Sequence, residues 1–242
     1  MLKNIIEFSA SEDYLNLKEN YPQPIKLHIP SWFKKLEHSP DNLTIKGCIP
    51  FLETMTTGYV LTLPQDFHLQ HNVFKDGKLI SRFVPSVRDR NMFNLNFQEN
   101  PELHPTDQVG DSPFVKKNLN FPINKILNPW TIKTPPGYSC LFTAPLNNTD
   151  DRFSIIAGIV NTDTFEIKIN FPFIVNGDKY PVLDTILKQG TPYVQVIPFK
   201  RNDWKMKIKK EQNKISFMNS FLHTLKVLHR YKLKWWSKSN FS

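Results

Sequence analysis

Short apolar runs separated by turn residues dominate the stretch 134–204. The β-rich runs in it are 138–143, 153–160, 165–175, 185–187 and 193–199. Strands of this length and spacing are typical of antiparallel sheets in a compact barrel or sandwich. We therefore predict that this central stretch forms the main sheet structure, with a tight turn at Asn176-Gly177.

Further strands are predicted before the central stretch. Residues 59–63 form one apolar run, and residues 67–74 and 78–84 flank Lys75-Asp76-Gly77. Glycine adopts positive φ without a steric cost, so this tripeptide predicts a hairpin with Gly77 at positive φ.

Helices are expected to be few and short. Residues 31–36 read as one or two helical turns capped by Ser31. Pro50 and Gly58 bracket a second short helix, because proline suits the first helical turn and glycine the position after the last. Residues 211–234 turn helical, with apolar residues at three-to-four spacing.

These elements predict a mainly β protein: a single antiparallel β-barrel or β-sandwich domain with a few short helices and a C-terminal helix. The all-β domain spans 1–210, with helical decorations near the N-terminus and an irregular excursion at 88–130. A basic amphipathic helix at 211–242 is expected to dock on it by its apolar stripe. Nineteen prolines against eight glycines, with 13% aromatic residues, fit a loop-rich β protein.

Charge is concentrated at the C-terminal end. Residues 200–242 hold 12 Lys or Arg against 2 Asp or Glu, whereas residues 1–199 hold 19 against 20. The net charge of +9 therefore belongs to the tail, and no basic groove for nucleic acid is indicated on the body. The tail leaves open a nucleic-acid contact, which we rank below simple docking of the helix.

The cysteine content and the apolar runs also indicate the cellular compartment. Cys48 and Cys140 are the only cysteines, and we expect both as reduced, buried thiols. No run of apolar residues reaches transmembrane length, and the N-terminal residues lack a signal-peptide pattern. We therefore expect a cytoplasmic protein without a membrane span.

Classical catalytic and cofactor motifs are absent. There is no glycine-rich phosphate loop, no nucleophile elbow and no catalytic cysteine signature, so no cofactor is indicated. His68 and His71 fall on opposite faces of one predicted strand and cannot reach one metal ion together. The catalytic residues, if any, are therefore unknown, and no metal site is predicted.

A small polar or anionic ligand is the expected partner, bound between the central sheet and the excursion. The residues predicted to line its pocket are Tyr138, Arg152, Asn161, Asp163, Gln195, His104 and Asp107. Arg152 would bind an anionic group of the ligand, and Tyr138 would stack on the ligand. The side chains of Asn161, Gln195 and Asp163 would form hydrogen bonds with the ligand's donors and acceptors. The alternative is structural: Asp163 makes its own turn and Gln195 satisfies nearby backbone groups.

Two family resemblances bear on this pattern. Residues 158–165 (GIVNTDTF) and 190–197 (GTPYVQVI) resemble the second half of the dUTPase and dCTP deaminase family, as does Pro136-Gly137-Tyr138 before a strand. The resemblance implies a related all-β fold, in which an acidic residue of the first turn orients water or contacts the deoxyribose. Asn161 stands where a dUTPase carries its key Asp, and an amide cannot act as a base. The family's Arg-Ser-Gly/Ser phosphate motif is also missing upstream, so the shared activity is unsupported.

The phrases TIKGCIPFLETMTTGY and TPPGYSCLFTAPLN are similar to a family of phage and bacterial proteins of unknown function. Three functions remain open on the sequence. The first is ligand binding in a β-domain pocket. The second is a non-enzymatic virion or assembly protein with a jelly-roll-like fold, which would form a homo-oligomer. The third is an enzyme acting on nucleotides or small acids, favoured if Cys48 or His104 lies in a pocket near a carboxylate.

Overall fold

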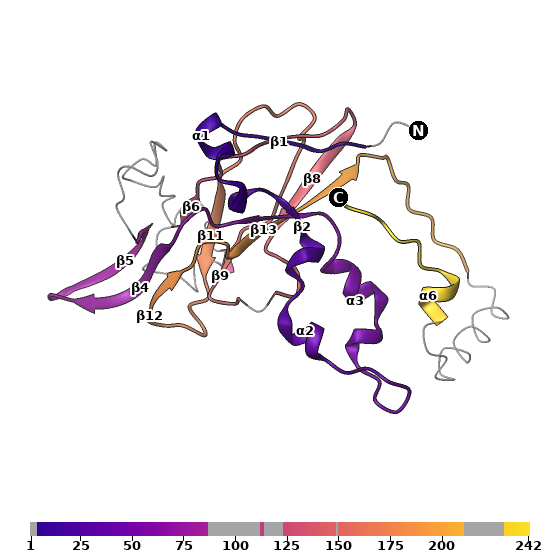
Figure 1. Ribbon diagram of the computed structural model, residues 1–242, viewed down its shortest axis with the longest axis horizontal. Coiled ribbons are helices and arrows are strands. Elements are labelled where there is room, and N and C mark those ends of the chain that lie inside the picture. The colour runs from indigo at the N-terminus through magenta and orange to yellow at the C-terminus, as the bar shows by residue number, and fades with distance from the viewer. Residues whose placement is uncertain (1–3, 87–111, 114–122, 149, 211–229) are drawn as a thin grey trace.

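Short strands make up most of the protein, as the computed structural model shows for residues 4–86, 112–113, 123–148, 150–210 and 230–242 (Figure 1). The strands are β1 (Glu7–Ser9), β2 (Gln23–Pro24), β3 (Tyr59–Thr62), β4 (Phe67–Lys75), β5 (Lys78–Pro85), β6 (Asn124–Ile126), β7 (Thr131–Lys133), β8 (Tyr138–Thr143), β9 (Phe153–Ile155), β10 (Gly158–Val160), β11 (Phe171–Val175), β12 (Leu183–Leu187) and β13 (Pro192–Lys200). The helices are α1 (Glu12–Leu15), α2 (Ser31–Lys35), α3 (Ile49–Thr54) and α6 (Arg230–Lys234), with 3₁₀ turns η1 (Lys18–Asn20), η2 (Ile25–His28) and η3 (Ile45–Gly47). The predicted class, mainly β with a few short helices, is confirmed.

Four antiparallel sheets are formed by the described strands. Their orders are β10-β8-β13-β3-β2, β6-β11-β9, β12-β4-β5 and β1-β7. None of these sheets closes on itself, so within the described residues the predicted barrel is not found. The open sheets instead pack against one another through a shared core.

Most predicted strands are found, but two differ from the prediction: the run 165–175 is a strand only over β11, and the run 153–160 is divided. The run 153–160 is two strands, because β9 pairs with β11 while β10 pairs with β8 in another sheet. The chain changes sheet at Ile156 and Ala157, and Ile156 N–H donates to Pro172 O at 2.8 Å. An unbroken apolar run cannot reveal such a crossing, since both halves carry strand-forming residues.

The predicted hairpin turn is found, and the predicted Asn-Gly turn only in part. The β4–β5 hairpin turns at Asp76 and Gly77, with φ of 51° and 74°. A turn at 177–179 follows β11, where Asn176 O accepts from Tyr180 N–H at 2.9 Å, but neither Asn176 nor Gly177 has the positive φ that an Asn-Gly hairpin turn favours. Ser31 does not cap α2: the N-cap is Pro30, and no side chain caps the helix.

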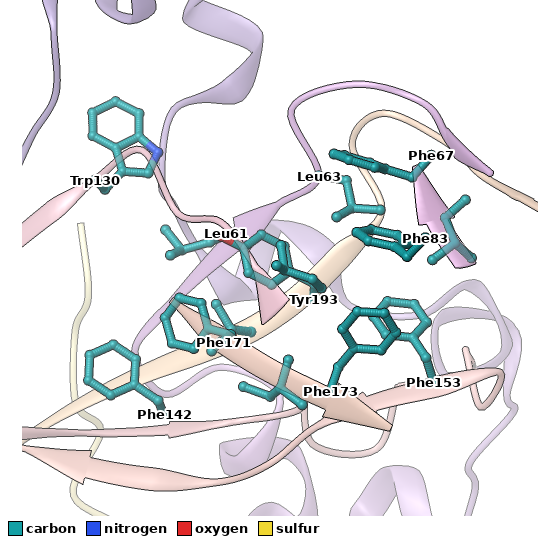
Figure 2. Packing of buried hydrophobic residues seen from close by; sticks show 14 of the residues in the cluster. Leu61, Leu63, Phe67, Phe83, Trp130, Phe142, Phe153, Phe171, Phe173 and Tyr193 are labelled. Carbon is teal, nitrogen blue, oxygen red and sulfur yellow. The ribbon is translucent and has the colours of Figure 1, made fainter. Parts of the chain in front are cut away.

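Phenylalanines of β11 lie at the centre of the core (Figure 2). Phe171 contacts Phe142 of β8 and Tyr193 of β13, with ring centroids 5.4 and 5.7 Å apart. Phe173 contacts Phe83 of β5 at 4.9 Å and Phe153 of β9 at 5.9 Å. The alternation along β11 places both rings on the same buried face of the strand, and this face contacts both neighbouring sheets.

The stretch 88–130, predicted as irregular, is described only at its C-terminal end and at 112–113. There β6 pairs with β11, and Trp130 is buried against Tyr14 and Tyr21, with ring centroids 5.3 and 5.7 Å away. This end of the stretch is therefore part of the core.

Gly58 fixes how α3 joins β3. Its φ is +85°, and a Cβ at this position would lie 2.2 Å from the Val196 carbonyl oxygen of β13. Both the backbone conformation and the close approach of β13 therefore require glycine.

We predict that Gly58→Ala lowers the free energy of unfolding by about 3 kcal/mol or more, because β13 must move and an L residue is strained at this φ. Gly77→Ala is the matched control: its φ is +74°, but no atom lies within 4 Å of the added methyl group. It should cost only about 1–2 kcal/mol. Urea denaturation of both variants measures the difference, and equal losses would show that the Val196 contact is unimportant.

Candidate functional site

Three predicted site residues meet at one end of the five-stranded sheet. Arg201, directly after β13, donates from Nη1 to Asp163 Oδ1 at 2.8 Å and forms an ion pair with Asp163 Oδ2. The same Nη1 donates to the Tyr138 carbonyl oxygen at 2.9 Å and to Ser139 Oγ at 3.0 Å. Ser139 Oγ in turn donates to Asn161 Oδ1 at 2.8 Å. We call this group of residues the Arg201 network.

Local turns hold the Arg201 network in place. Asn161 O accepts from the N–H groups of Thr164 and Phe165, which closes the turn after β10. Gly137, with φ of +82°, donates its N–H to Asp163 Oδ2 at 2.8 Å. Hydrogen bonds from Arg201 and from the Gly137 N–H lower the pKa of Asp163 to about 2.

The Arg201 network was only half visible in the sequence. Asp163 and Asn161 were predicted to face a ligand, whereas Arg201 was not singled out. The carboxylate of Asp163 has intramolecular partners in Arg201 and the Gly137 N–H, which lie far from it in sequence, rather than in its own turn as the structural alternative supposed.

Arg152 lies in a different part of the protein, against β12. Its Nε and Nη2 donate to Asp150 at 2.9 and 2.7 Å, and Nη1 donates to Thr185 Oγ1 at 3.0 Å. The hydrogen bonds with Asp150 raise the pKa of Arg152. An anion would therefore have to compete with Asp150 for this guanidinium group.

Gln195 is fully buried under the end of α3. Its Nε2 donates to the carbonyl oxygens of Thr54 and Thr57 at 2.9 and 2.8 Å, and its Oε1 accepts from Leu146 N–H at 3.0 Å. The side chain thus joins β13, the helix end and the loop after β8. His104 and Asp107 lie outside the described residues.

A cleft of 360 Å³ opens in the central stretch, built by the loop after β8, by β9 and β11, and by the start of β13. Its polar lining residues are Asn147, Asn148, Asp150, Asp151, Ser154 and Asn176; its apolar wall includes Ile174, Val175, Pro192 and Tyr193. We call it the central cleft. Its volume lies in the range of small-molecule sites.

Strand alternation explains why Ser154 faces the central cleft. Its neighbours Phe153 and Ile155 are buried in the core, and Ser154 lies opposite Ile174 of β11. Within the described part of the chain, the side chains of Ser154 and Asn176 make no hydrogen bond. They are therefore available to a ligand.

The two carboxylates of the central cleft each have a cationic partner that does not line it. Asp150 accepts from Arg152, and Asp151 forms an ion pair with Lys179 and accepts from Tyr180 Oη at 2.6 Å. Hydrogen bonds from Lys179 and Tyr180 lower the pKa of Asp151. Among the described residues, the cleft is therefore lined by carboxylates and not by lysine or arginine side chains.

Of the five predicted ligand residues that the structure describes, none lines the central cleft, although Arg152 adjoins it in sequence. The polar run 147–151 between β8 and β9 is the signal in the sequence that could have pointed to this cleft. Ser154 and Asn176 carry no such signal.

Both cysteines are free, as predicted, but they differ in burial. Cys140 is fully buried, and burial raises the pKa of its thiol to about 11. Cys48 is exposed, so the expectation that it is buried was wrong. As the N-cap of α3 it lies at the protein surface and lines neither the central cleft nor the other large cavity, near α2.

Metal-ligating groups do not gather anywhere in the described ranges. His68 instead bonds Asp184 Oδ1 across β4 and β12 at 2.5 Å, and Gln70 Nε2 donates to Asp184 Oδ2 at 3.0 Å. These residues form a cross-strand polar ladder on the sheet surface.

The basic tail leaves the body after the Arg201 network. Residues 202–210 are exposed, and Trp204, Met206 and Ile208 alternate with lysines there. The end of the chain returns to the body, where Trp236 Nε1 donates to Glu53 at 2.7 Å and Phe241 packs on Tyr59. The apolar stripe expected to dock lies outside the described residues, and the nucleic-acid contact stays a prediction.

No described helix combines the length and the apolar character that crossing a membrane requires.

Comparisons with known proteins place the chain only loosely. No family model and no curated protein matches it. Among solved structures, it is similar to a native EIAV dUTPase, with a TM-score of 0.35 and 11% identity over 87% of this chain and 100% of that one. The resemblance to dUTPases is therefore shown only as a weak structural similarity, from which no function is inferred.

The Arg201 network should give stability a specific pH dependence. Because the folded pKa of Asp163 is about 2, below the ordinary value of 3.8, its contribution is complete above about pH 4–5. It is lost as the pH falls toward 2. We expect Asp163→Asn to lower the melting temperature at pH 7 and to match the parent protein near pH 2.

Thermal unfolding of both proteins from pH 7 to pH 2 measures this. Asp41→Asn, a change at an exposed bend residue between α2 and η3 and outside the network, is the control and should leave the pH profile unchanged. A difference between Asp163→Asn and the parent that is the same at pH 7 and pH 2 would contradict the role assigned to this carboxylate.

Proposed function

We propose that the protein binds a small, uncharged, polyhydroxylated molecule in the central cleft. The observation that carries the proposal is the chemistry of this 360 Å³ cleft, where carboxylate and amide groups face an apolar wall. Such a lining suits a ligand that donates several hydrogen bonds and has one apolar face. A nucleoside or a monosaccharide has both properties.

Charge supports an uncharged ligand over an anionic one. The side chains of Asp150 and Asp151 line the cleft, while their partners Arg152 and Lys179 do not. A phosphate in the cleft would therefore meet carboxylates before it met a cation. Phosphorylated ligands should bind more weakly than their neutral parents.

Ser154 and Asn176 are the residues we assign to ligand recognition. Their side chains make no hydrogen bond among the described residues; Ser154 is on β9, and Asn176 directly follows the neighbouring strand β11. The backbone N–H of Asn176 donates to Arg152 O at 2.9 Å, so a substitution of its side chain keeps this bond. Both positions can therefore be changed without removing a known contact.

We propose binding rather than catalysis because, in the part of the chain that the structure describes, neither a cysteine nor a histidine lines the cleft beside its serine and carboxylates. The alternatives of an assembly protein and of an enzyme acting on nucleotides remain predictions from sequence.

The test is a thermal-shift and NMR saturation-transfer screen of nucleosides and monosaccharides beside their monophosphates. We expect a neutral compound to bind, and Ser154→Ala or Asn176→Ala to weaken it roughly threefold to tenfold through one lost hydrogen bond.

Asn202→Ala is the matched control, because Asn202 is an exposed amide outside the cleft, and it should bind as the parent does. Tighter binding of the monophosphates, or equal affinity in Asn176→Ala and Asn202→Ala, would refute the proposal.

A further inference from the structure

A second cavity lies between the N-terminal helices and the returning C-terminal segment. It has a volume of 410 Å³ and is bounded by α2, η3, α3 and α6. In Figure 1, α2 and α3 lie side by side, away from the sheets of the central stretch. This cavity shares no lining residue with the central cleft.

Its floor is apolar and firmly packed. Phe33 and Ile49 are buried there, and Leu52 adds a partly exposed edge. Phe33 stacks on Phe51 of α3, with ring centroids 5.8 Å apart and an interplanar angle of 28°. This contact joins α2 to α3, so the floor is a fixed surface and not a chance gap between mobile side chains.

One wall depends on a glycine. A Cβ at Gly47 would lie 2.3 Å from the His38 ring, so a side chain there would displace this histidine. His38 Nδ1 accepts from Thr44 N–H at 3.0 Å, which holds the loop that leads to η3. The wall of the cavity is therefore built by local hydrogen bonding.

Three lysines line the cavity beside this apolar floor. Lys34 is on α2, Lys46 is on η3 and Lys232 is on α6, so segments far apart in the sequence supply them. Lys46 Nζ donates to the Lys34 carbonyl oxygen at 2.9 Å, which keeps one amine near the end of α2. Among the described residues, no carboxylate lies within 4.0 Å of any of the three amines.

The positive charge of Lys34 also affects the nearby side chain of His28. Burial lowers the pKa of His28, and the charge of Lys34 lowers it further. Like charges repel one another, and no described carboxylate neutralises these three, so an anion placed beside them would be attracted.

We propose that this lysine-rimmed cavity binds an anionic amphiphile, a molecule with one carboxylate on an alkyl or aryl body. The apolar body lies on Phe33, Ile49 and Leu52, and the carboxylate accepts hydrogen bonds from the lysines. A nucleic acid does not fit as well, because bases need exposed aromatic faces for stacking and Phe33 is buried. A neutral apolar ligand would leave the three lysines without a role.

Decanoate is the probe, titrated below its micelle-forming concentration by isothermal calorimetry against the full chain. Decan-1-ol and decyltrimethylammonium are the matched neutral and cationic probes. We expect decanoate to bind best and to weaken as salt rises from 50 to 500 mM. Lys34→Gln and Lys232→Gln should each weaken it about threefold to fivefold, as for partly exposed charge pairs.

Lys35→Gln is the matched control variant, because Lys35 is on α2 but does not line the cavity, and it should bind decanoate normally. Leu52→Trp, which fills the cavity while keeping all three lysines, should abolish binding. Circular dichroism confirms that each variant is folded.

Three outcomes would overturn the proposal. The first is that decanoate binds no better than decan-1-ol or does not bind at all. The second is that Lys34→Gln and Lys35→Gln bind decanoate equally well. The third is a dimer of the parent protein in sedimentation velocity that Leu52→Trp disrupts, which would assign the cavity to a second copy of the chain. Neither cavity needs the other, so failure here leaves the nucleoside and sugar screen unaffected.

Discussion

Packing of phenylalanines on β11 is the interaction on which the rest of the structure depends. The three larger sheets have no ladder of backbone hydrogen bonds between them among the described strands, so side chains must hold them together. Phe171 reaches the five-stranded sheet through Phe142 and Tyr193, and Phe173 reaches the β12-β4-β5 sheet through Phe83. Each fully buried phenylalanine contributes roughly 1.5–3 kcal/mol, so two such residues on one short strand are a large part of a marginal stability.

Polar side chains on β13 and directly after it add hydrogen bonds that join other elements to this core. Gln195 satisfies two carbonyl oxygens at the end of α3 and the Leu146 N–H, which would otherwise be buried without partners. Arg201, just beyond the strand, joins the ends of β8 and β10 through Tyr138, Ser139 and Asp163. Polar side chains that resemble ligand contacts in the sequence therefore also position the loops that form the cavities.

The two cavities differ in charge because different parts of the chain build them. The central cleft takes most of its polar groups from the loop after β8. Asp150 and Asp151 line the cleft, whereas their cationic partners Arg152 and Lys179 do not. The lysine-rimmed cavity takes its amines from short helical segments at the two ends of the chain. Electrostatic complementarity thus sorts ligands between them: hydrogen-bond donors at one, anions at the other.

The sequence by itself determined the class of the fold and most of its strands. Alternating and continuous apolar runs, turn residues such as Asp76-Gly77, and the Pro50–Gly58 helix bracket are local signals, and the structure follows them. It also determined that the cysteines are unpaired and that the charge lies in the tail. All of these depend on residues close together in the chain.

Only the tertiary structure decided which strand joins which sheet and which polar groups meet. The run 153–160 divides between two sheets because its halves find different partners, β11 and β8, and nothing local encodes that choice. Asp163 accepts a hydrogen bond from Arg201, 38 positions away in the sequence. Lys34 and Lys232, which lie near opposite ends of the chain, line the same cavity. Such contacts arise from packing of distant segments, so residue types and spacing alone cannot locate a cavity or show which side chains are already occupied.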